Sequence, residues 1–448
     1  MGETIAAIST PFGDGGIGLL RLSGPDSLSI ASRVIQNVSR ETSSHKVMHG
    51  WIYDDNIPID EVLYYYLKEP HSYTGEDMVE ISCHGNPVIL QKILSLLLGA
   101  GARLAGRGEF TKKAFLNGKI DLIQAESVVD IIRARSVLLG ELAVGNLSGR
   151  LSGEIGGLRA ELLDLLAGIE ASIDFPEDLE RLSEEKLVMA LSGAVDRVDV
   201  LLAGAHGGRL LRSGVRVAII GKPNVGKSSL LNALLGEERA IVDSKPGTTR
   251  DTIEESFDVG GICATVIDSA GIRDVSDFVE GRGVERARRE WQSADYVLLV
   301  LDSSAKLDDM DIRLLGCSDP ERTLLVLNKQ DLFSMIGENE LPHGVPLVWV
   351  SARHKSGLSD LQRALYKLMM GGRPLFKETI LINSRHEGCL LEAKSSLIKS
   401  LESAKMGAEL DCVAIDLRAA VTTLGEISGA AVGKEVLDRI FDSFCVGK

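Results

Sequence analysis

Residues 217–229, VAIIGKPNVGKSS, constrain the fold of this chain more than any other stretch of its sequence. An apolar, strand-like run at 217–220 leads directly into residues 221–228, which match the pattern G-x-x-x-x-G-K-[ST] of a phosphate-binding loop. Glycines let backbone N–H groups turn toward an anion, and the helix expected next adds its positive N-terminus. A purely structural glycine-rich turn is the competing interpretation, which the flanking strand and helix disfavour. The sequence therefore predicts an α/β P-loop domain, with Lys227 at the outer phosphates and Ser228 facing Mg²⁺.

Composition limits what the rest of the chain can be. Its 448 residues suggest about three domains. The formal net charge of −15 argues against a surface coated for nucleic acid, so any RNA contact is expected to be confined to one site. Six cysteines without a C-x-x-C pair predict neither a zinc site nor a disulfide framework. With no signal-like start and no apolar run of about 18 residues, we expect a cytoplasmic protein without a membrane span.

Residues 1–117 predict an α+β domain. Short apolar runs at 4–8, 18–22, 62–67 and 78–82 indicate strands, and the periodicity of residues 88–98 indicates a helix. Three stretches are rich in small and charged residues: 11–21, 73–80 and 106–111. They are open to two interpretations, loops that form a small-molecule pocket near Arg21 and Glu80, or ordinary turns. His84 is interpreted as structural, because no partner suggests a metal.

Residues 118–213 and 373–448 show helical periodicity. One apolar stripe predicts a long helix that Pro176 ends, and a second predicts an antiparallel neighbour. The first stripe runs through Leu151, Ile155, Leu158, Leu162, Leu165, Ile169 and Ile173, and the second through Leu187, Leu191, Val195, Val198 and Leu202. The pattern resumes later at Leu390, Leu397 and Leu401, then at Leu410, Val413, Leu417, Val421 and Leu424. We therefore expect one discontinuous helical domain into which a G domain, residues 214–372, is inserted, with Gly207-Gly208 and Gly371-Gly372 near the junction loops.

Further motifs in residues 214–372 follow the order of a GTP-binding domain. The loop KPGTTR at 245–250 predicts that Thr249 completes the Mg²⁺ coordination. The sequence DSAG at 268–271 offers Asp268 near the metal and the Gly271 N–H to a γ-phosphate.

The remaining motifs select the base. NKQD at 328–331 follows an apolar run, and the Asp331 carboxylate accepts two N–H bonds that guanine offers and adenine does not. A backbone N–H at Ser351-Ala352 is expected to reach the guanine O6. The predicted nucleotide is GTP, and its predicted binding residues are Asn224, Val225, Gly226, Lys227, Ser228, Ser229, Asp268, Gly271, Asn328, Lys329, Asp331, Ser351 and Ala352.

The means of GTP hydrolysis is less evident. Ile272 stands where a Ras-like enzyme carries the glutamine that orients the attacking water, so an acid or amide from elsewhere is needed. Glu280 is one candidate. No arginine finger is evident either. Another positive charge must then act at the phosphates, and Asn224 with loop carbonyls around Asp243, Lys245 and Thr248 offers one possible site for a monovalent cation.

The last residues, FDSFCVGK at 441–448, form an unusual end. Prenylation of Cys445 is rejected because Gly447 and Lys448 do not fit the motif. Two interpretations stay open, a free thiol in a disordered tail or a reactive group delivered to a pocket. The neighbouring Phe441 and Phe444 favour a packed tail.

The series GKPNVGKSS, KPGTTRD, DSAG, NKQD and SAR inside a helical domain, with CVGK at the end, resembles the tRNA modification GTPase family MnmE, also called TrmE. The resemblance covers essentially the whole chain, including GGIGLLR, SYTGEDMVE, GEFTKKAFLNGKIDL and IDFPE. It implies a K⁺-dependent GTP hydrolase that acts with the FAD-dependent partner MnmG on certain tRNAs. Together they build a carboxymethylaminomethyl or aminomethyl group at carbon 5 of the wobble uridine.

The same resemblance implies the cofactor and the assembly. The one-carbon unit comes from 5,10-methylenetetrahydrofolate or 5-formyltetrahydrofolate. The N-terminal domain binds the folate and forms a homodimer, the G domains meet across it when K⁺ and GTP are bound, and MnmG adds to give a heterotetramer or larger complex.

Individual roles follow from the matching positions. Asn224 holds K⁺, assisted by backbone oxygens of Asp243, Lys245 and Thr248, and Glu280 orients the water. Mg²⁺ lies between Ser228 and Thr249, near Asp268. The resemblance implies Arg21, Glu80, Lys119 and Lys448 as the folate residues, and Cys445 matches the functional thiol of the family. This chain departs from the family pattern mildly, with Val225 for Ala, Lys245-Pro246 in a variable part of the loop, and Val446 for Ile.

The alternative is a regulatory or ribosome-assembly GTPase of the Era and Der type. Such a switch explains the G domain equally well. It does not explain the folate-like N-terminal domain or the CVGK end.

Overall fold

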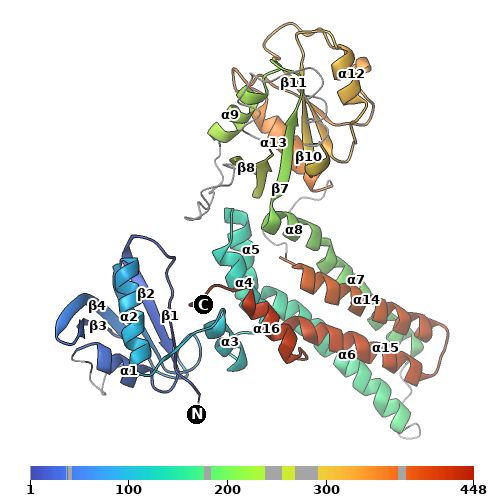
Figure 1. The fold of residues 1–448 in the computed structure, drawn as a ribbon. Helices are drawn as coiled ribbons and strands as arrows, with labels where there is room; N and C mark the ends of the chain where they lie inside the picture. Colours follow the sequence, from blue (N-terminus) through green and yellow to red (C-terminus); the bar gives the residue numbers. More distant parts are fainter. Residues whose placement is uncertain are drawn as a thin grey trace. The chain divides into compact units, whose positions relative to one another are not determined.

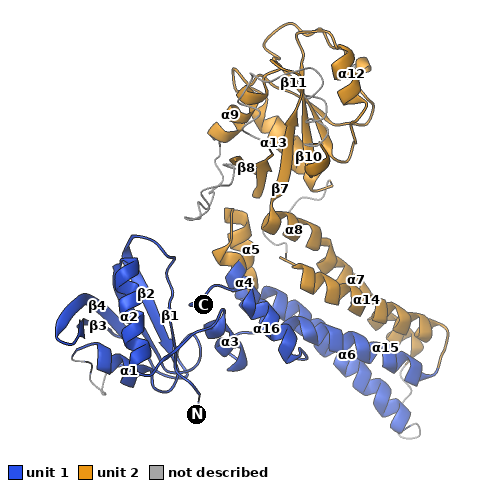
Figure 2. Cartoon of the chain, viewed as in Figure 1, with its two compact units in different colours: residues 1–129, 147–182, 409–448 blue, residues 130–146, 183–408 orange. Residues whose placement is uncertain are grey.

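The computed structural model describes residues 2–36, 38, 43–175, 183–237, 255–267, 291–371 and 380–448 (Figure 1). The chain divides into two compact units (Figure 2). Unit 1 contains residues 1–129, 147–182 and 409–448, and unit 2 contains residues 130–146 and 183–408. Each unit combines one sheet with part of the helical region.

Unit 1 contains an antiparallel sheet with one parallel edge. Its strands are β1 (Ile5–Ile8), β2 (Gly15–Ser23), β3 (Val47–Asp54), β4 (Ile57–Leu67), β5 (Met78–Gly85) and β6 (Arg103–Leu104), in the order β3-β4-β5-β2-β1-β6. Helices α1 (Ser27–Val34) and α2 (Pro87–Gly99) bury their apolar sides against one face of this sheet. Asn86 starts α2, because its side chain accepts the N–H groups of Val88 and Ile89. The opposite face carries a second, smaller apolar cluster together with the polar residues Arg21 and Glu80.

The four predicted strands and the helix of this segment are confirmed, and β3 was not foreseen. Within the stretch 11–21, the loop interpretation is wrong for residues 15–17, because β2 already begins at Gly15, whereas Arg21 and Glu80 lie in the strands predicted for them. Gly18 shows why glycine occurs inside this strand. A Cβ atom there would lie 2.7 Å from Leu90 Cδ2 of α2, so this glycine serves close packing of a helix on a strand rather than a turn.

Besides α1 and α2, the described helices of unit 1 are α3 (Glu109–Leu116), most of α4 (Leu122–Ile132), α6 (Arg150–Asp174), α15 (Leu410–Ser428) and α16 (Lys434–Asp442). The long helix α6 packs along α15. Its predicted end is confirmed to within two residues, although Pro176 itself lies outside the described residues. Gly429, with φ of 94°, ends α15 in the left-handed conformation that glycine adopts easily.

Most positions of the two predicted apolar stripes are buried as expected, and a few are replaced by a neighbouring residue. On α6 the buried residue is Leu166 rather than Leu165, and Ile173 is only partly buried. On α7 (Glu184–Ala203) Ala194 and Leu201 replace Val195 and Leu202. On both helices a shift occurs where two leucines are adjacent, at 165–166 and at 201–202, and periodicity alone does not decide which of the two faces the core. Later in the chain Leu390, Leu397, Val413, Leu417, Val421 and Leu424 are buried as expected, whereas Leu401 and Leu410 are partly buried.

Unit 2 holds α5 (Val137–Leu147), α7, α8 (Ala205–Ser213) and α14 (Ser384–Lys405), and α7 packs along α14. The expected junction loop at Gly207-Gly208 is wrong, because both glycines are buried inside α8. A Cβ at Gly208 would lie 2.8 Å from the Ile382 carbonyl, so the missing side chain admits the chain that returns from the inserted domain. Gly371, exposed with φ of 57°, follows α13 (Leu358–Met369), and Gly372 lies outside the described residues, so a junction at this pair stays a prediction.

The inserted domain is built on a mostly parallel sheet. Its strands are β7 (Val215–Ile220), β8 (Glu255–Val259), β9 (Ile262–Val266), β10 (Tyr296–Asp302), β11 (Thr323–Asn328) and β12 (Leu347–Trp349), in the order β12-β11-β10-β7-β9-β8. Only β8 runs antiparallel to its neighbour. Its helices in the described ranges are α9 (Lys227–Glu237), α12 (Asp309–Leu315), the short 3-10 helix η2 (Glu338–Glu340) and α13 (Leu358–Met369). Strands β10 and β11 are almost wholly apolar, as expected for parallel strands covered on both faces.

The predicted fold class is therefore confirmed: an α/β P-loop domain lies within a helical region that follows an α+β segment. The domain boundaries at residues 117, 213 and 372 stay a prediction, since the two compact units are divided elsewhere. Among the helices of the described ranges, none combines the length and apolar character that crossing a membrane requires.

Candidate functional site

The phosphate loop joins strand β7 to helix α9. The strand is buried and ends at Ile220, and the loop crosses to Lys227, the first residue of the helix. Asn224 adopts a left-handed φ of 64° in this loop. The Lys227 ammonium donates to the carbonyls of Gly221 and Lys222, both at 2.7 Å, and so folds back over the loop. This is the position from which a lysine can reach the outer phosphates of a nucleotide.

The side chain of Asn328 ties three loops together. Its Nδ2 donates to the Val225 carbonyl at 2.8 Å, and its Oδ1 accepts the Ala352 N–H at 3.0 Å. Asn328 itself is 3% exposed. A Cβ at Gly226, where φ is 98°, would lie 2.2 Å from Asn328 Nδ2, so only glycine fits. The predicted phosphate loop, NKQD segment and Ser351-Ala352 loop thus form one connected structure.

Asp331 lies at the rim of this structure. Ser351 Oγ donates to Asp331 Oδ1 at 2.5 Å, and this hydrogen bond holds the pKa of Asp331 below its ordinary value. The Lys329 ammonium lies 2.6 Å from Asp302 Oδ2, at the end of β10. Asp331 is therefore kept as a carboxylate that can accept N–H groups, as readout of guanine requires.

Not every predicted nucleotide residue falls in the described part of the chain. Ser228 and Ser229 lie in the first turn of α9, and Asn224 is exposed in the loop. Asp243, Lys245, Thr248, Thr249, Asp268, Gly271 and Glu280 lie outside the described residues. The Ser228 hydroxyl, on the helix that follows the phosphate loop, suits Mg²⁺, which prefers oxygen ligands.

A second site lies on the polar face of the unit 1 sheet. Arg21 on β2 faces Glu80 on β5, and its Nε donates to Glu80 Oε1 at 2.6 Å. The guanidinium lies between two rings, 5.5 Å from the centroid of Tyr73 and 5.7 Å from that of Phe110. Tyr65 donates to the other oxygen of Glu80. Burial and the bond to Glu80 raise the pKa of Tyr65 to about 12, so this hydroxyl stays a donor at neutral pH.

The predicted folate residues are only partly brought together. Lys448 lies close enough for the positive charge of Arg21, after burial, to lower its pKa. Lys119 instead donates to the Pro70 carbonyl at 3.0 Å, and it is exposed. Cys445 is exposed three residues before Lys448 and is a free thiol. The structure therefore brings Arg21, Glu80 and Lys448 together, whereas Lys119 contacts the Pro70 carbonyl instead of this group.

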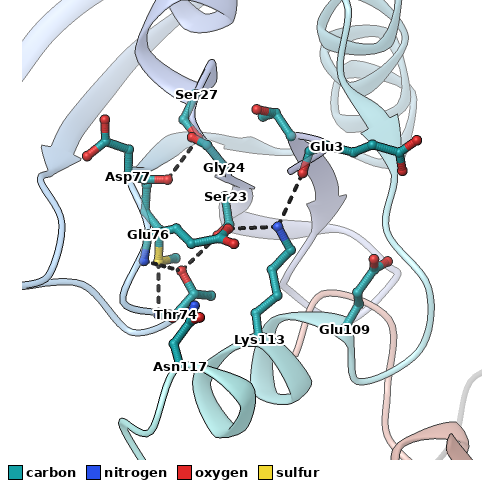
Figure 3. Close-up of polar contacts among 12 residues, drawn as sticks. Glu3, Ser23, Gly24, Ser27, Thr74, Glu76, Asp77, Glu109, Lys113 and Asn117 are labelled. Atoms are coloured by element: carbon teal, nitrogen blue, oxygen red, sulfur yellow. Dashed lines mark hydrogen bonds and ion pairs between the residues drawn. The ribbon is translucent and has the colours of Figure 1, made fainter. Parts of the chain in front are cut away.

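The loop before β5 is fastened to its surroundings by polar side chains (Figure 3). Ser23 bonds Thr74 at 2.7 Å and Glu76 at 3.0 Å. From α3, Lys113 donates to Glu76 Oε2 at 2.7 Å and Asn117 donates to the Thr74 carbonyl at 2.8 Å. Residues 74–76, which precede Glu80 in the chain, are therefore held in place by side chains of β2 and α3.

Several residues of this second site were not named from the sequence, although Tyr73 and Phe110 lie within the stretches 73–80 and 106–111 that were singled out there. Tyr65, Tyr73 and Phe110 contact the Arg21–Glu80 pair, and the Ser9 hydroxyl donates to the carbonyl of Gly447. A partial signal was available for Tyr65, which alternates with the buried positions of β4 and so faces the same side as Glu80. No local pattern joins Ser9 to Gly447.

Two family models match the chain. The model described as "MnmE helical domain" matches residues 122–445, and the one described as "GTP-binding protein TrmE N-terminus" matches residues 4–119. A protein of Alkaliphilus metalliredigens named "tRNA modification GTPase MnmE" is 43% identical over 457 residues, covering 100% of this chain and 99% of the relative. Relatives of the same name from Clostridioides difficile and Thermotoga petrophila are 42% identical, cover 100% of this chain, and are themselves covered to 99% and 100%.

A solved structure of the G domain of the T. maritima FeoB iron transporter is 26% identical and covers 34% of this chain and 98% of its own, with a TM-score of 0.25. That score is too low for the likeness to bear on fold or function. The two family models and the identity over the full length show that the chain belongs to the MnmE family of tRNA modification GTPases.

Proposed function

We propose that the chain hydrolyses GTP and takes part in tRNA modification. The observation that carries this proposal is the connected nucleotide site, in which Asn328 joins the phosphate loop to the loops that would hold the base. Family membership supports the same conclusion. Bound GTP would place its phosphates against the N-terminus of α9, with Lys227 at the outer phosphates and Ser228 toward Mg²⁺.

Hydrolysis itself rests on residues that the family resemblance supplies. In this proposal Asn224 and backbone oxygens of Asp243, Lys245 and Thr248 hold K⁺, whose positive charge replaces an arginine finger. Thr249 and Asp268 complete the Mg²⁺ site, the Gly271 N–H meets the γ-phosphate, and Glu280 orients the attacking water.

Exchange of the monovalent cation tests this proposal. GTP turnover should be fast in K⁺ and slower by about tenfold or more in Na⁺, because the smaller ion does not fill a site built for K⁺. Steady-state phosphate release at equal ionic strength measures the difference. Equal rates in the two salts would remove K⁺ from the mechanism.

Glu280→Ala separates catalysis from binding. The variant should lose about a hundredfold or more in turnover, as expected when a group that positions the nucleophile is removed, while its affinity for GTP changes little. Single-turnover hydrolysis and titration with a fluorescent GTP analogue give the two values. A variant with normal turnover would exclude Glu280 from the chemistry.

The second part of the proposal concerns the modification. We infer that, with the FAD-dependent partner MnmG, the chain adds a carboxymethylaminomethyl or aminomethyl group to the wobble uridine of certain tRNAs. The bound tetrahydrofolate supplies the one-carbon unit. Arg21, Glu80, Lys119 and Lys448 would hold the folate, and Cys445 would act in the reaction. A homodimer, a larger complex with MnmG and a cytoplasmic location belong to the same proposal.

Folate binding distinguishes this function from a GTPase switch of the Era or Der type. The full-length chain should bind 5-formyltetrahydrofolate in calorimetric titration, and tRNA from a strain lacking the chain should lose the modified wobble nucleoside. Normal modification in that strain, together with the absence of folate binding, would favour the switch.

A further inference from the structure

Residues 445–448 lie as a short added strand against the loop before α3. Arg107 and Val446 form an antiparallel β-bridge. The Gly108 N–H donates to the Cys445 carbonyl, and the Phe110 N–H donates to the Lys448 main-chain oxygen, both at 3.2 Å. The segment is therefore held by its backbone.

Gly447 is the point where this segment meets the sheet. Its φ is 88°, and a Cβ there would lie 2.3 Å from the Ile8 carbonyl oxygen. Its own carbonyl accepts a hydrogen bond from Ser9 Oγ at 3.1 Å and a longer one from Arg21 Nη1 at 3.4 Å. Only glycine can approach the end of β1 this closely.

An aromatic anchor holds the other side of the segment. Phe441 and Phe444 are 1% and 3% exposed, and their ring centroids lie 5.2 Å apart. Gly108, with φ of 60°, leaves no room for a Cβ, which would lie 2.7 Å from the Phe441 carbonyl oxygen. The backbone of Cys445 is thus held on one side by the buried rings of Phe441 and Phe444 and on the other by the contact of Gly447 with β1.

The side chains of the segment diverge from this backbone. Gly447 is buried, Cys445 is exposed, and Lys448 is half-buried beside the charges of Arg21 and Glu80. The Gly447 contacts therefore determine where two side chains of the second site lie, although Ser9 and Gly447 carry no reactive or charged group.

We propose that Ser9 and Gly447 are positioning residues of the folate site, which hold residues 445–448 on β1 and so set Cys445 and Lys448 beside the Arg21–Glu80 pair. The proposal rests on the proposed function, because it takes the Arg21–Glu80 site as the place of folate binding. It adds two residues that act through the placement of Cys445 and Lys448.

Hydrogen exchange tests the placement directly. In the full-length chain the Gly108 and Phe110 amides are covered by residues 445–448, so peptides spanning 106–111 should exchange slowly. Gly447→Ala should speed their exchange by about tenfold or more. Gly433→Ala is the matched control, because Gly433 has a φ of −69° and a Cβ there meets nothing within 4 Å.

Binding of 5-formyltetrahydrofolate tests the consequence. Gly447→Ala should raise the Kd by about tenfold or more, and Ser9→Ala by about threefold to tenfold, the range that loss of one hydrogen bond gives. Ser9→Thr keeps the hydroxyl and should restore the Kd. Thermal unfolding of each variant, compared with the parent chain, shows whether the fold is retained.

The outcomes are distinct. If the parent chain binds no 5-formyltetrahydrofolate, the proposed function fails, and this inference fails with it. If the parent chain binds it and Gly447→Ala binds equally well, or if exchange at 106–111 is unchanged, the inference alone is overturned. A raised Kd with faster exchange in Gly447→Ala, absent from Gly433→Ala and rescued at Ser9 by Thr, supports it.

Discussion

At the scale of single residues, Asp331 and Ser351 show how a neighbour prepares a functional group. The hydroxyl of Ser351 donates to the carboxylate at 2.5 Å and holds the pKa of Asp331 below its ordinary value. Both residues follow strands of the same sheet, β11 and β12, which pair in parallel register. Their meeting was predictable, because the carboxyl ends of parallel strands share one edge of a sheet.

Asp331→Asn should exchange the base preference of the site. The amide offers an N–H where the carboxylate accepts one, which suits xanthine and not guanine. Affinity for GTP should fall by about a hundredfold or more while affinity for XTP rises, as two charge-assisted hydrogen bonds are involved. Competition of both nucleotides against a fluorescent analogue measures this. Unchanged GTP selectivity would contradict the readout by Asp331.

The His84–Asp60 pair gives a pH-dependent contribution to stability. His84 Nδ1 lies 2.6 Å from Asp60 Oδ1, and this hydrogen bond, together with the negative charge, raises the pKa of His84 above 6.5. A histidine whose pKa is raised by folding stabilises the protein fully below its unfolded value, and the stabilisation is lost as pH rises through the folded value.

The unfolding temperature of the parent chain should therefore decline as pH rises above about 6.5, and His84→Gln should reduce that decline. Thermal unfolding between about pH 5.5 and 8.5 is the measurement. His343→Gln is the control, because His343 is exposed and has no salt bridge to any described residue. Identical pH profiles for His84→Gln and the parent chain would exclude the contribution. The interpretation of His84 as structural stays a prediction until then.

The parts of the sites that the sequence predicted lie within short motifs, whereas the parts that it did not predict join residues far apart in the sequence. The phosphate loop and NKQD were identified because their chemistry lies within a few consecutive residues. The contact of Ser9 with Gly447 spans 438 positions and involves a hydroxyl and a main-chain carbonyl, so no motif carries it.

At the scale of elements, the sequence predicted whether a segment is a helix or a strand more reliably than it predicted which residues of a helix are buried. Periodicity placed α6 and α7 correctly, but Leu166 and Leu201 are buried where Leu165 and Leu202 were expected. Glycine caused the larger error. Gly208 was expected near a junction loop but lies inside a helix, where it admits the Ile382 carbonyl. A glycine that serves close packing cannot be told from a turn glycine without its neighbour.

A glycine in the β8–β9 turn also allows close packing of a neighbouring element, and a substitution there tests this role. Gly261 has a φ of 93°, and a Cβ there would lie 2.9 Å from Leu138 of α5. Gly261→Ala should lower the free energy of unfolding by about 1–3 kcal/mol, because the conformation is strained and the helix must shift. Denaturant unfolding followed by circular dichroism measures it.

Gly193→Ala should stabilise the protein, in contrast to Gly261→Ala. Gly193 lies exposed within α7, and a Cβ there meets nothing within 4 Å. This substitution should raise the free energy of unfolding by about 0.5–1 kcal/mol, the difference in helix propensity. Equal effects of the two substitutions would contradict the packing described for the β8–β9 turn.

At the scale of the whole molecule, the two proposed sites belong to different compact units. Arg21, Glu80 and Lys448 lie in unit 1, and the nucleotide residues lie in unit 2. Binding at either site should then be removable alone. Glu80→Gln removes the charge that Arg21 and Tyr65 contact, so it should weaken 5-formyltetrahydrofolate binding by about tenfold or more and leave GTP affinity unchanged.

Asp331→Asn should give the reverse result, with GTP binding lost and folate affinity retained. Calorimetric titration of both ligands against both variants completes the comparison. If each substitution weakened both ligands, the two sites would be energetically coupled, and the separation by unit would be wrong.

The pairing of α6 with α15 has a consequence for how the chain is made. Leu410, the first residue of α15, is 236 positions after Asp174, the last residue of α6. At a synthesis rate of about 5–20 residues per second, the apolar stripe of α6 waits roughly 10–50 s on the ribosome for its partner. The inserted nucleotide domain emerges complete within that interval. The side of α6 that packs on α15 therefore has no partner during this interval, and it is a surface that a chaperone would protect in the nascent chain.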